Sequence, residues 1–169
     1  MSQTVDEHRA SSPTRLRLAV VTVSDSRTPQ TDVAGKTVAE LLTAAGHETA
    51  AREIISDEPA DIERLLRALA ARNDLDAILL TGGTGLTSRD STIEVVSRLL
   101  TKTLPGYGEL FRLLSFREIG PAAMLSRAVG GVIGPKVVLT MPGSPAAVRL
   151  AMERLILPEL AHLVREARR

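Results

Sequence analysis

The residues of this chain best suited to chemistry lie in the stretch LLTGGTGLTSRDST, residues 79–92. Backbone N–H groups and hydroxyls are concentrated there, at Thr81, Gly82, Gly83, Thr84, Gly85 and Ser88. Glycines let an oxyanion approach the backbone closely, and a helix beginning near residue 91 would direct its positive end toward the same point. The stretch therefore fits a phosphate cradle, although it matches neither a Walker loop nor GxGxxG. A tight turn closed by a capping box between Ser91 and Glu94 explains the glycines equally well.

Two aspartates, Asp57 and Asp90, follow strand-like runs of the chain. Phosphoryl chemistry with magnesium needs hard oxygen ligands near the phosphates. A carboxylate beside a phosphate is repulsive unless a cation lies between them, so the pair indicates catalytic and metal-binding roles. Each aspartate taken alone is also common at a helix N-terminus, where it would act as a cap.

A second loop of similar pattern follows the last predicted strand. The segment MPGSPAAV places Pro142 and Gly143 in a turn, Ser144 at a helix N-cap and Pro145 at the first helical position. These local roles account for the residues fully. If the loop also binds an anion, two phosphate-binding loops would suit a nucleotide together with a phosphorylated acceptor.

Alternating strands and helices must position these loops. Apolar runs predict strands at residues 16–24, 48–56, 75–83 and 137–141, with a weaker run before the last. Apolar residues at helical spacing predict helices at residues 33–45, 58–72, 91–101, 107–120 and 144–167, the last bent near Pro158. This order predicts an α/β fold with a parallel sheet. Because ligands collect beyond the carboxyl ends of such strands, we expect the loops to meet at one rim.

Other side chains have simpler interpretations. Tyr107, Phe111 and Leu114 form an apolar stripe at helical spacing, which predicts a core or subunit contact. The histidines, His8, His47 and His162, are scattered and fit surface or packing positions. Arginines such as Arg112, Arg117 and Arg127 could meet anions, but nothing in the sequence singles one out.

Composition limits the partners. The 169 residues suit one domain at residues 15–169, preceded by a flexible polar tail at residues 1–14. Aromatic residues make up 2% and the net charge is +1, which argues against nucleic acid and membrane surfaces. The lack of cysteine excludes disulfides and thiolate zinc sites. No apolar run approaches the roughly 20 residues of a membrane helix, and we expect a cytoplasmic protein.

Four segments carry a family resemblance: TGGTGLTSRDSTIE, GYGELFRLLSFREIG, SRAVGG and MPGSPAAV. They occur in the order seen in the MoaB/Mog family of molybdenum cofactor biosynthesis proteins, which the chain resembles over residues 16–163. The GELFR…S…EIG…SRA portion is similar to the B-type, or MoaB, branch. Four motifs in register are far more specific than one glycine loop.

The resemblance implies a three-layer α/β/α sandwich with a mostly parallel sheet, assembled as a trimer or a dimer of trimers. It implies a molybdopterin adenylyltransferase that uses Mg²⁺ and ATP to transfer AMP to molybdopterin, with the molybdate-insertion protein as a further partner. By matching positions it assigns catalysis and magnesium binding to Asp57 and Asp90. It assigns the nucleotide and pterin site to the glycine loop, to residues 142–145, and to Ser24 and Asp25 after the first strand.

Two other functions remain open at this point. One is a non-catalytic carrier of molybdopterin or of the finished cofactor, and the other is an oligomerisation module like the related one in gephyrin. Some B-type members lack an acid at the position of Asp57, so its presence here favours catalysis. Gly130 stands where the family usually has alanine, and we expect it to loosen a strand.

Overall fold

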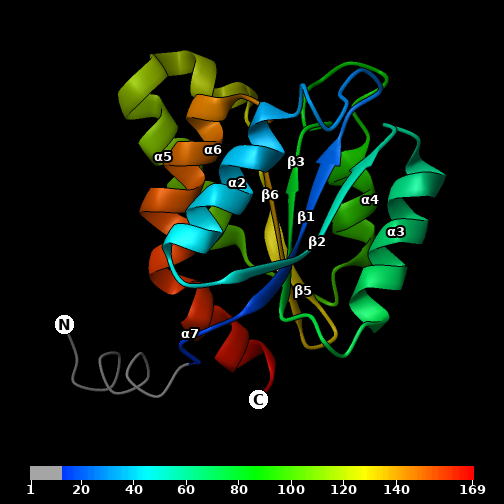
Figure 1. Ribbon diagram of the computed structural model, residues 1–169. Helices are drawn as coiled ribbons and strands as arrows, with labels where there is room; N and C mark the ends of the chain where they lie inside the picture. Colours follow the sequence, from blue (N-terminus) through cyan, green and yellow to red (C-terminus); the bar gives the residue numbers. More distant parts are fainter. Residues whose placement is uncertain (1–12) are drawn as a thin grey trace.

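Six strands form one mixed sheet in the computed structural model, which describes residues 13–169 (Figure 1). In chain order the elements are β1 (Arg17–Val23), α2 (Val33–Ala44), β2 (Glu48–Ile55), α3 (Pro59–Ala71), β3 (Ala77–Thr81), α4 (Thr92–Leu99), β4 (Lys102–Thr103), α5 (Pro105–Ile119), the 3-10 helix η1 (Gly120–Leu125), β5 (Gly130–Ile133), β6 (Lys136–Met141), α6 (Pro145–Ala151), the π-helix η2 (Met152–Ile156) and α7 (Leu157–Ala167). Each predicted strand and helix has a counterpart. Residues 1–12 of the predicted tail, with His8, lie outside the described residues.

The sheet has the order β2-β1-β3-β6-β5-β4. Strands β2, β1, β3 and β6 are parallel, whereas β5 runs antiparallel to both β6 and β4. Helices α2, α5, α6 and α7 cover one face of the sheet, and α3 and α4 cover the other (Figure 1). The three-layer α/β/α sandwich with a mostly parallel sheet is therefore confirmed.

Strand β4 is an element that the sequence did not predict. The helix expected to reach residue 101 ends at Leu99, and Leu100 has an extended backbone. Thr101 donates its backbone N–H (2.8 Å) and its Oγ1 (3.0 Å) to the carbonyl of Val132 in β5. Pairing with the sheet edge therefore replaces the last helical turn.

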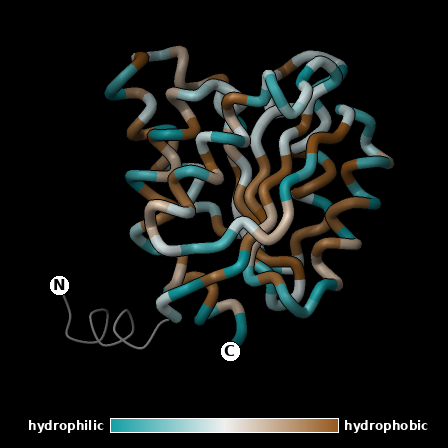
Figure 2. Tube along the Cα trace, viewed as in Figure 1, coloured by the Kyte–Doolittle hydropathy of each residue, from teal (hydrophilic) through white to brown (hydrophobic). Residues whose placement is uncertain are grey.

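The core lies on both faces of the central strands because their side chains alternate. In β1, Leu18 and Val20 pack toward α2, α5, α6 and α7, whereas Ala19 and Val21 pack toward α3 and α4. Figure 2 shows the apolar strands between helices whose outer sides are hydrophilic.

The predicted stripe on α5 belongs to this core. Tyr107 and Phe111 are buried, and Leu114 packs against them. The Tyr107 hydroxyl donates to the carbonyl of Thr140 in β6 at 2.8 Å. Gly130 in β5 lies beside the same ring, and a Cβ added there would stand 2.6 Å from Leu139 Cδ2. Neighbouring side chains thus fill the space that alanine would need.

The C-terminal helix departs from regular geometry at the predicted place. Five π-helical residues of η2 separate α6 from α7, and Pro158 occupies the first turn of α7. Proline has no N–H for the preceding helical turn, so a wider turn before it is a reasonable response. Within residues 13–169, no helix combines the length and the apolar character needed to cross a bilayer.

Four loops follow the carboxyl ends of the parallel strands at one edge of the sheet, the upper edge in Figure 1. They connect β1 to α2, β2 to α3, β3 to α4 and β6 to α6. Three of them contain the predicted glycine loop, Asp57 and the PGSP segment. The expected rim is therefore present.

Candidate functional site

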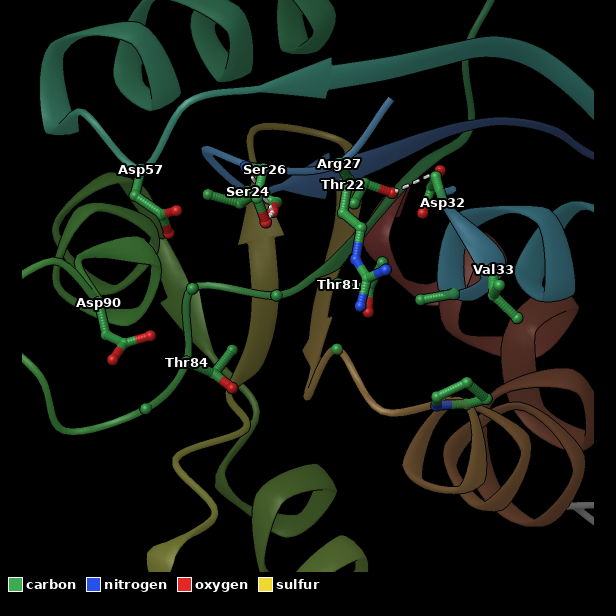
Figure 3. A pocket seen from close by; sticks show the side chains of 17 residues that line it. Thr22, Ser24, Ser26, Arg27, Asp32, Val33, Asp57, Thr81, Thr84 and Asp90 are labelled. Carbon is green, nitrogen blue, oxygen red and sulfur yellow. Dashed lines mark hydrogen bonds between the residues drawn. The ribbon is translucent and has the colours of Figure 1, made fainter. Parts of the chain in front are cut away.

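A cavity of about 350 Å³ opens at this rim (Figure 3). Of the residues predicted for the site, it is lined by Ser24, Asp57, Thr81, Gly82, Gly83, Thr84, Gly85, Asp90, Gly143 and Pro145. The structure thus brings residues from all four loops around one space. The cavity is also lined by residues that the sequence did not single out, namely Thr22, Val23, Ser26, Arg27, Asp32, Val33 and Ala34.

Four predicted residues lie beside this cavity without lining it. Pro142 and Ser144 line a neighbouring cavity that shares Thr84 and Gly85 with the first. The Ser144 side chain accepts from the Ala147 N–H at 3.3 Å, so its predicted N-cap role is confirmed. The other two are Asp25, which bonds to neighbouring loops, and Ser88, which is exposed in the glycine loop.

The glycine loop turns where side chains have no room. Gly82 and Gly83 have φ angles of 92° and 60°, in the left-handed region that glycine tolerates. A Cβ on Gly83 would collide with Thr92 Oγ1 and stand 2.8 Å from Asp57 Oδ1. The Gly82 N–H is already bonded to the Met141 carbonyl at 3.2 Å. Within residues 13–169, the N–H groups of Gly83 and Thr84 have no bonding partner, so these two could bind an oxyanion.

The capping-box interpretation of this loop is wrong. The Ser91 side chain makes no cap bond to α4, and its Oγ donates to the carbonyl of Asp57 at 2.7 Å. Glu94 pairs with Arg127. Because Arg127 also donates to the carbonyls of Thr84 (3.1 Å) and Asp90 (3.2 Å), these side chains hold the glycine loop in place from outside.

Asp57 is not a helix cap either. The N-cap of α3 is Glu58, and Asp57 instead exchanges hydrogen bonds with Asp25. Its Oδ2 accepts from the Asp25 N–H at 3.2 Å, and its own N–H donates to Asp25 Oδ1 at 3.1 Å. Burial raises the pKa of Asp57, and the nearby carboxylates of Asp25 and Asp90 add to the rise, against the opposing effects of the Asp25 N–H and Arg89.

Asp90 lies in the opposite electrostatic situation. Its Oδ2 accepts from the Thr87 hydroxyl at 2.6 Å and from the Thr87 N–H at 3.0 Å. Chiefly the Thr87 hydroxyl, together with the N–H groups of Thr87 and Gly85, lowers the pKa of Asp90. Asp90 does not cap α4, because the N-cap residue of that helix is Ser91 and the Asp90 carboxylate bonds to Thr87 within the loop. Asp90 is therefore held ionised beside the glycines.

Arg89, in the β3–α4 loop, connects that loop to the loops that follow β1 and β2. Its guanidinium bonds Asp25 Oδ2 at 2.6 Å and Glu58 Oε1 at 2.5 Å, from the loops after β1 and β2. Since Asp25 in turn bonds Asp57, Arg89 links the β3–α4 loop to the carboxylate that lines the cavity. The sequence did not single out Arg89, because its partners lie 31 and 64 residues away.

Asp32 anchors the other end of the cavity. Its side chain is fully buried and accepts from Thr22 Oγ1 at 3.0 Å, the Gly35 N–H at 2.9 Å and Arg52 at 2.7 Å. It is the N-cap of α2. An aspartate directly before an apolar helical pattern is a cap signal in the sequence that could have identified it.

The described residues offer oxygen ligands but no complete metal site. No group of three His, Cys, Asp or Glu side chains within residues 13–169 is arranged to hold a metal ion. Thr92 Oγ1, next to Gly83, is buried with no hydrogen-bond partner among the described residues, but Thr92 does not line the cavity. The cavity itself offers the two carboxylates of Asp57 and Asp90. Such a set could complete a magnesium shell only together with ligand oxygens.

Comparison with known proteins finds close relatives. Residues 19–162 match a family model described as a "Probable molybdopterin binding domain". The molybdenum cofactor biosynthesis protein B of Bacillus cereus is 51% identical over 166 residues, covering 98% of each chain. A crystal structure of a molybdenum cofactor biosynthesis protein B superposes with a TM-score of 0.89 at 51% identity, covering 93% of this chain and 98% of that one. The tungsten cofactor synthesizing protein MoaB from Pyrococcus furiosus gives 0.82 at 34% identity, with coverage of 93% and 99%.

Proposed function

This chain belongs to the MoaB/Mog family of molybdenum cofactor biosynthesis proteins, and on that premise we propose that it is a molybdopterin adenylyltransferase. The proposed reaction transfers AMP from ATP to the terminal phosphate of molybdopterin and releases pyrophosphate. The observation that supports it best is the meeting of the glycine loop with Asp57 and Asp90 in one cavity. Unpaired N–H groups suit phosphate oxygens, and paired carboxylates suit a cation that accompanies them.

Mg²⁺ is the cation that this donor set fits. The two carboxylates at the cavity are hard oxygen ligands, and Mg²⁺ commonly takes one or two carboxylates plus substrate phosphates. Burial is the main cause of the raised pKa of Asp57, and the carboxylates of Asp25 and Asp90 add to it; a neighbouring cation would relieve this second contribution. We propose Asp57 and Asp90 as its ligands. When bound, Mg²⁺ would neutralise part of the negative charge of the phosphates.

The transfer itself asks little covalent help of the protein. An oxygen of the pterin phosphate forms a bond to the α-phosphorus of ATP, and the bond from that phosphorus to the bridging oxygen breaks. The electron pair leaves with pyrophosphate. A phosphate monoester is already anionic at neutral pH, so no general base is required. The N–H groups of Gly83 and Thr84 would hold phosphate oxygens and keep the two reacting groups in line.

Asp90→Asn tests this function directly. We expect pyrophosphate release with ATP, Mg²⁺ and molybdopterin to fall by about 100-fold or more, because a neutral amide binds the cation far more weakly than a carboxylate does. The readouts are pyrophosphate release and the mass of the adenylylated pterin. Asp74→Asn is the matched control, because Asp74 is an acid paired with Arg72 outside the cavity, and its activity should stay at the wild-type level.

The same measurements on the wild-type protein also distinguish a transferase from a carrier of molybdopterin. Tight binding of molybdopterin without any adenylylated product would contradict the transferase and assign a carrier role instead. Equal activity of Asp90→Asn and the wild type would remove Asp90 from the reaction.

A further inference from the structure

We propose that Arg27 binds the phosphate monoester of the pterin acceptor, an inference that rests on the adenylyl transfer proposed above. Of the described residues that line the cavity, Arg27 alone carries a positive charge. It comes from the β1–α2 loop, and Figure 3 shows its guanidinium pointing toward Thr81. Asp57 and Asp90 lie together on the other side of the same view. Arg27 therefore lies apart from Asp57 and Asp90, and the third acid that lines the cavity, Asp32, is already paired with Arg52.

The two aspartates in the same loop do not neutralise Arg27, because each of them pairs with another arginine. These aspartates are Asp25 and Asp32. Arg89 from the glycine loop binds Asp25 at 2.6 Å, and Arg52 from β2 binds Asp32 at 2.7 Å. Within the described part of the chain, Arg27 makes no ion pair. A guanidinium in a cavity without a counterion is prepared for an anionic ligand.

The hydrogen bonds of the loop hold Arg27 in place and leave it donors. One nitrogen, Nη1, donates to the Thr31 carbonyl at 3.2 Å. The turn behind it is closed by the Thr28 N–H to Thr31 Oγ1 (2.9 Å) and by the Asp32 N–H to the Thr28 carbonyl (2.9 Å). A guanidinium has five N–H donors in a planar fork, so enough remain for two oxygens of one phosphate.

The division of charge in the cavity selects the acceptor's phosphate over those of the nucleotide. The phosphates of ATP bring Mg²⁺ with them and can approach Asp57 and Asp90 through that cation. The phosphate monoester of the pterin has no such cation, and beside unscreened carboxylates it would be repelled. Arg27 offers the positive partner that it needs. The same contact would hold the attacking phosphate without competing for the metal.

The test compares two ligands and four proteins. Equilibrium binding of molybdopterin and of its dephosphorylated form is measured anaerobically with wild type, Arg27→Gln, Arg27→Lys and Arg154→Gln. Arg154 is an exposed arginine without an ion pair among the described residues and lies outside the cavity, so it is the matched control. The measurement needs no turnover, so its outcome is independent of whether adenylylation occurs.

We expect Arg27→Gln to weaken molybdopterin binding by about 10- to 100-fold, the range for a charge-assisted bond to phosphate. Its affinity for the dephosphorylated pterin should stay within about twofold of wild type, since the lost partner is absent. Arg27→Lys should fall between, and Arg154→Gln should match wild type. Equal weakening of both pterins would overturn the proposal, as would unchanged affinity of Arg27→Gln for molybdopterin.

Discussion

Asp57 occupies a place that disfavours its own negative charge. It is partly buried, and the carboxylates of Asp25 and Asp90 lie nearby, so the pKa of Asp57 is raised above its usual 3.8. The folded protein therefore holds this proton more tightly than the unfolded chain does. The resulting stabilisation is complete below the unfolded pKa and is lost as the pH rises through the folded pKa.

Asp57→Asn should therefore stabilise the protein at neutral pH while it abolishes the proposed activity. The amide removes the unfavourable charge, and its oxygen can still accept from the Asp25 N–H. We expect the melting temperature at pH 7 to rise by a few degrees and the gain to shrink as the pH falls toward 3.8. Thermal unfolding across that pH range measures it. A variant less stable than wild type at pH 7 would contradict this account of Asp57.

Two separate effects oppose a side chain at Gly83: the positive φ angle of its backbone and the close approach of neighbouring side chains. Gly46 has a comparable positive φ of 84°, but no atom within 4 Å of an added Cβ. Gly46→Ala should cost about 1–2 kcal/mol in unfolding free energy from the angle alone. Gly83→Ala should cost at least about 1 kcal/mol more, because Thr92 and Asp57 must move. Urea unfolding of both variants gives the comparison, and equal losses would mean that the collision is relieved without cost.

The sequence predicted those residues of the site that lie in short, recognisable motifs. The glycine loop, Asp57 and Asp90 follow strand ends, where a short motif is visible in the chain itself. Arg27 was missed because one polar residue in a polar loop carries no signal until the loop folds. Ser88 was predicted from its hydroxyl, but it lies outside the cavity because a sequence does not show which way a loop residue faces.

At the level of the loops, Arg89 holds the loops after β1, β2 and β3 together through side-chain bonds. Arg89 bonds Asp25 and Glu58, and Asp25 in turn exchanges bonds with Asp57. Arg89, Asp25 and Glu58 are each about half exposed, so the two ion pairs of Arg89 add little to stability. Their effect falls instead on the position and the charge of Asp57.

Arg89→Gln should impair function far more than folding. We expect a stability loss of about 1 kcal/mol or less, but a loss of adenylylation of roughly 10- to 100-fold from misplaced loops. Because the Arg89 charge lowers the pKa of Asp57, its removal should also move the acid limb of the pH–activity profile to higher pH. The control is Arg67→Gln, which removes an exposed pair with Glu63 on α3. If the acid limb stayed at the same pH, the charge of Arg89 would have no effect on the pKa of Asp57.

The helices and strands themselves were more predictable than the contacts between their loops. Long apolar runs and helical spacing are local properties, and they gave every major element. β4 was missed because a two-residue strand exists only through its bonds to β5, which lies far along the chain. The link between Asp25 and Arg89 was hidden for the same reason.

At the scale of the whole molecule, the exposed large hydrophobic side chains of residues 13–169 are concentrated on α5 and η1. Six exposed hydrophobic side chains lie on α5 and η1, at Leu110, Leu113, Phe116, Ile119, Met124 and Leu125, with exposures between 49% and 78%. Among the described residues, only Val33 and Leu86 add to the large exposed apolar side chains elsewhere. Such concentrations on soluble domains commonly mark protein contacts. We expect a second copy of this chain to cover the surface, in the trimer or dimer of trimers that the family resemblance implies.

Phe116→Asp should therefore reduce the mass of the particle in solution. A charge placed in an apolar contact must lose its hydration there, which opposes association. Light scattering coupled to size-exclusion chromatography measures the mass. Leu86→Asp carries the same chemical change to an exposed leucine outside α5 and η1, and should leave the mass unchanged. A wild-type protein that is monomeric at all concentrations would refute the expectation.

The buried phenol of Tyr107 gives this molecule an unusual optical property. It is the only tyrosine, there is no tryptophan, and its hydroxyl is bonded to Thr140 inside the core. Burial raises the pKa of Tyr107, so tyrosinate absorption in alkali should appear only when the chain opens. Because the protein itself absorbs so weakly in the near ultraviolet, the absorption of a bound pterin can be followed without a label. The same scarcity of aromatic rings that argues against base stacking thus leaves the spectral region of a bound pterin almost free of protein absorption.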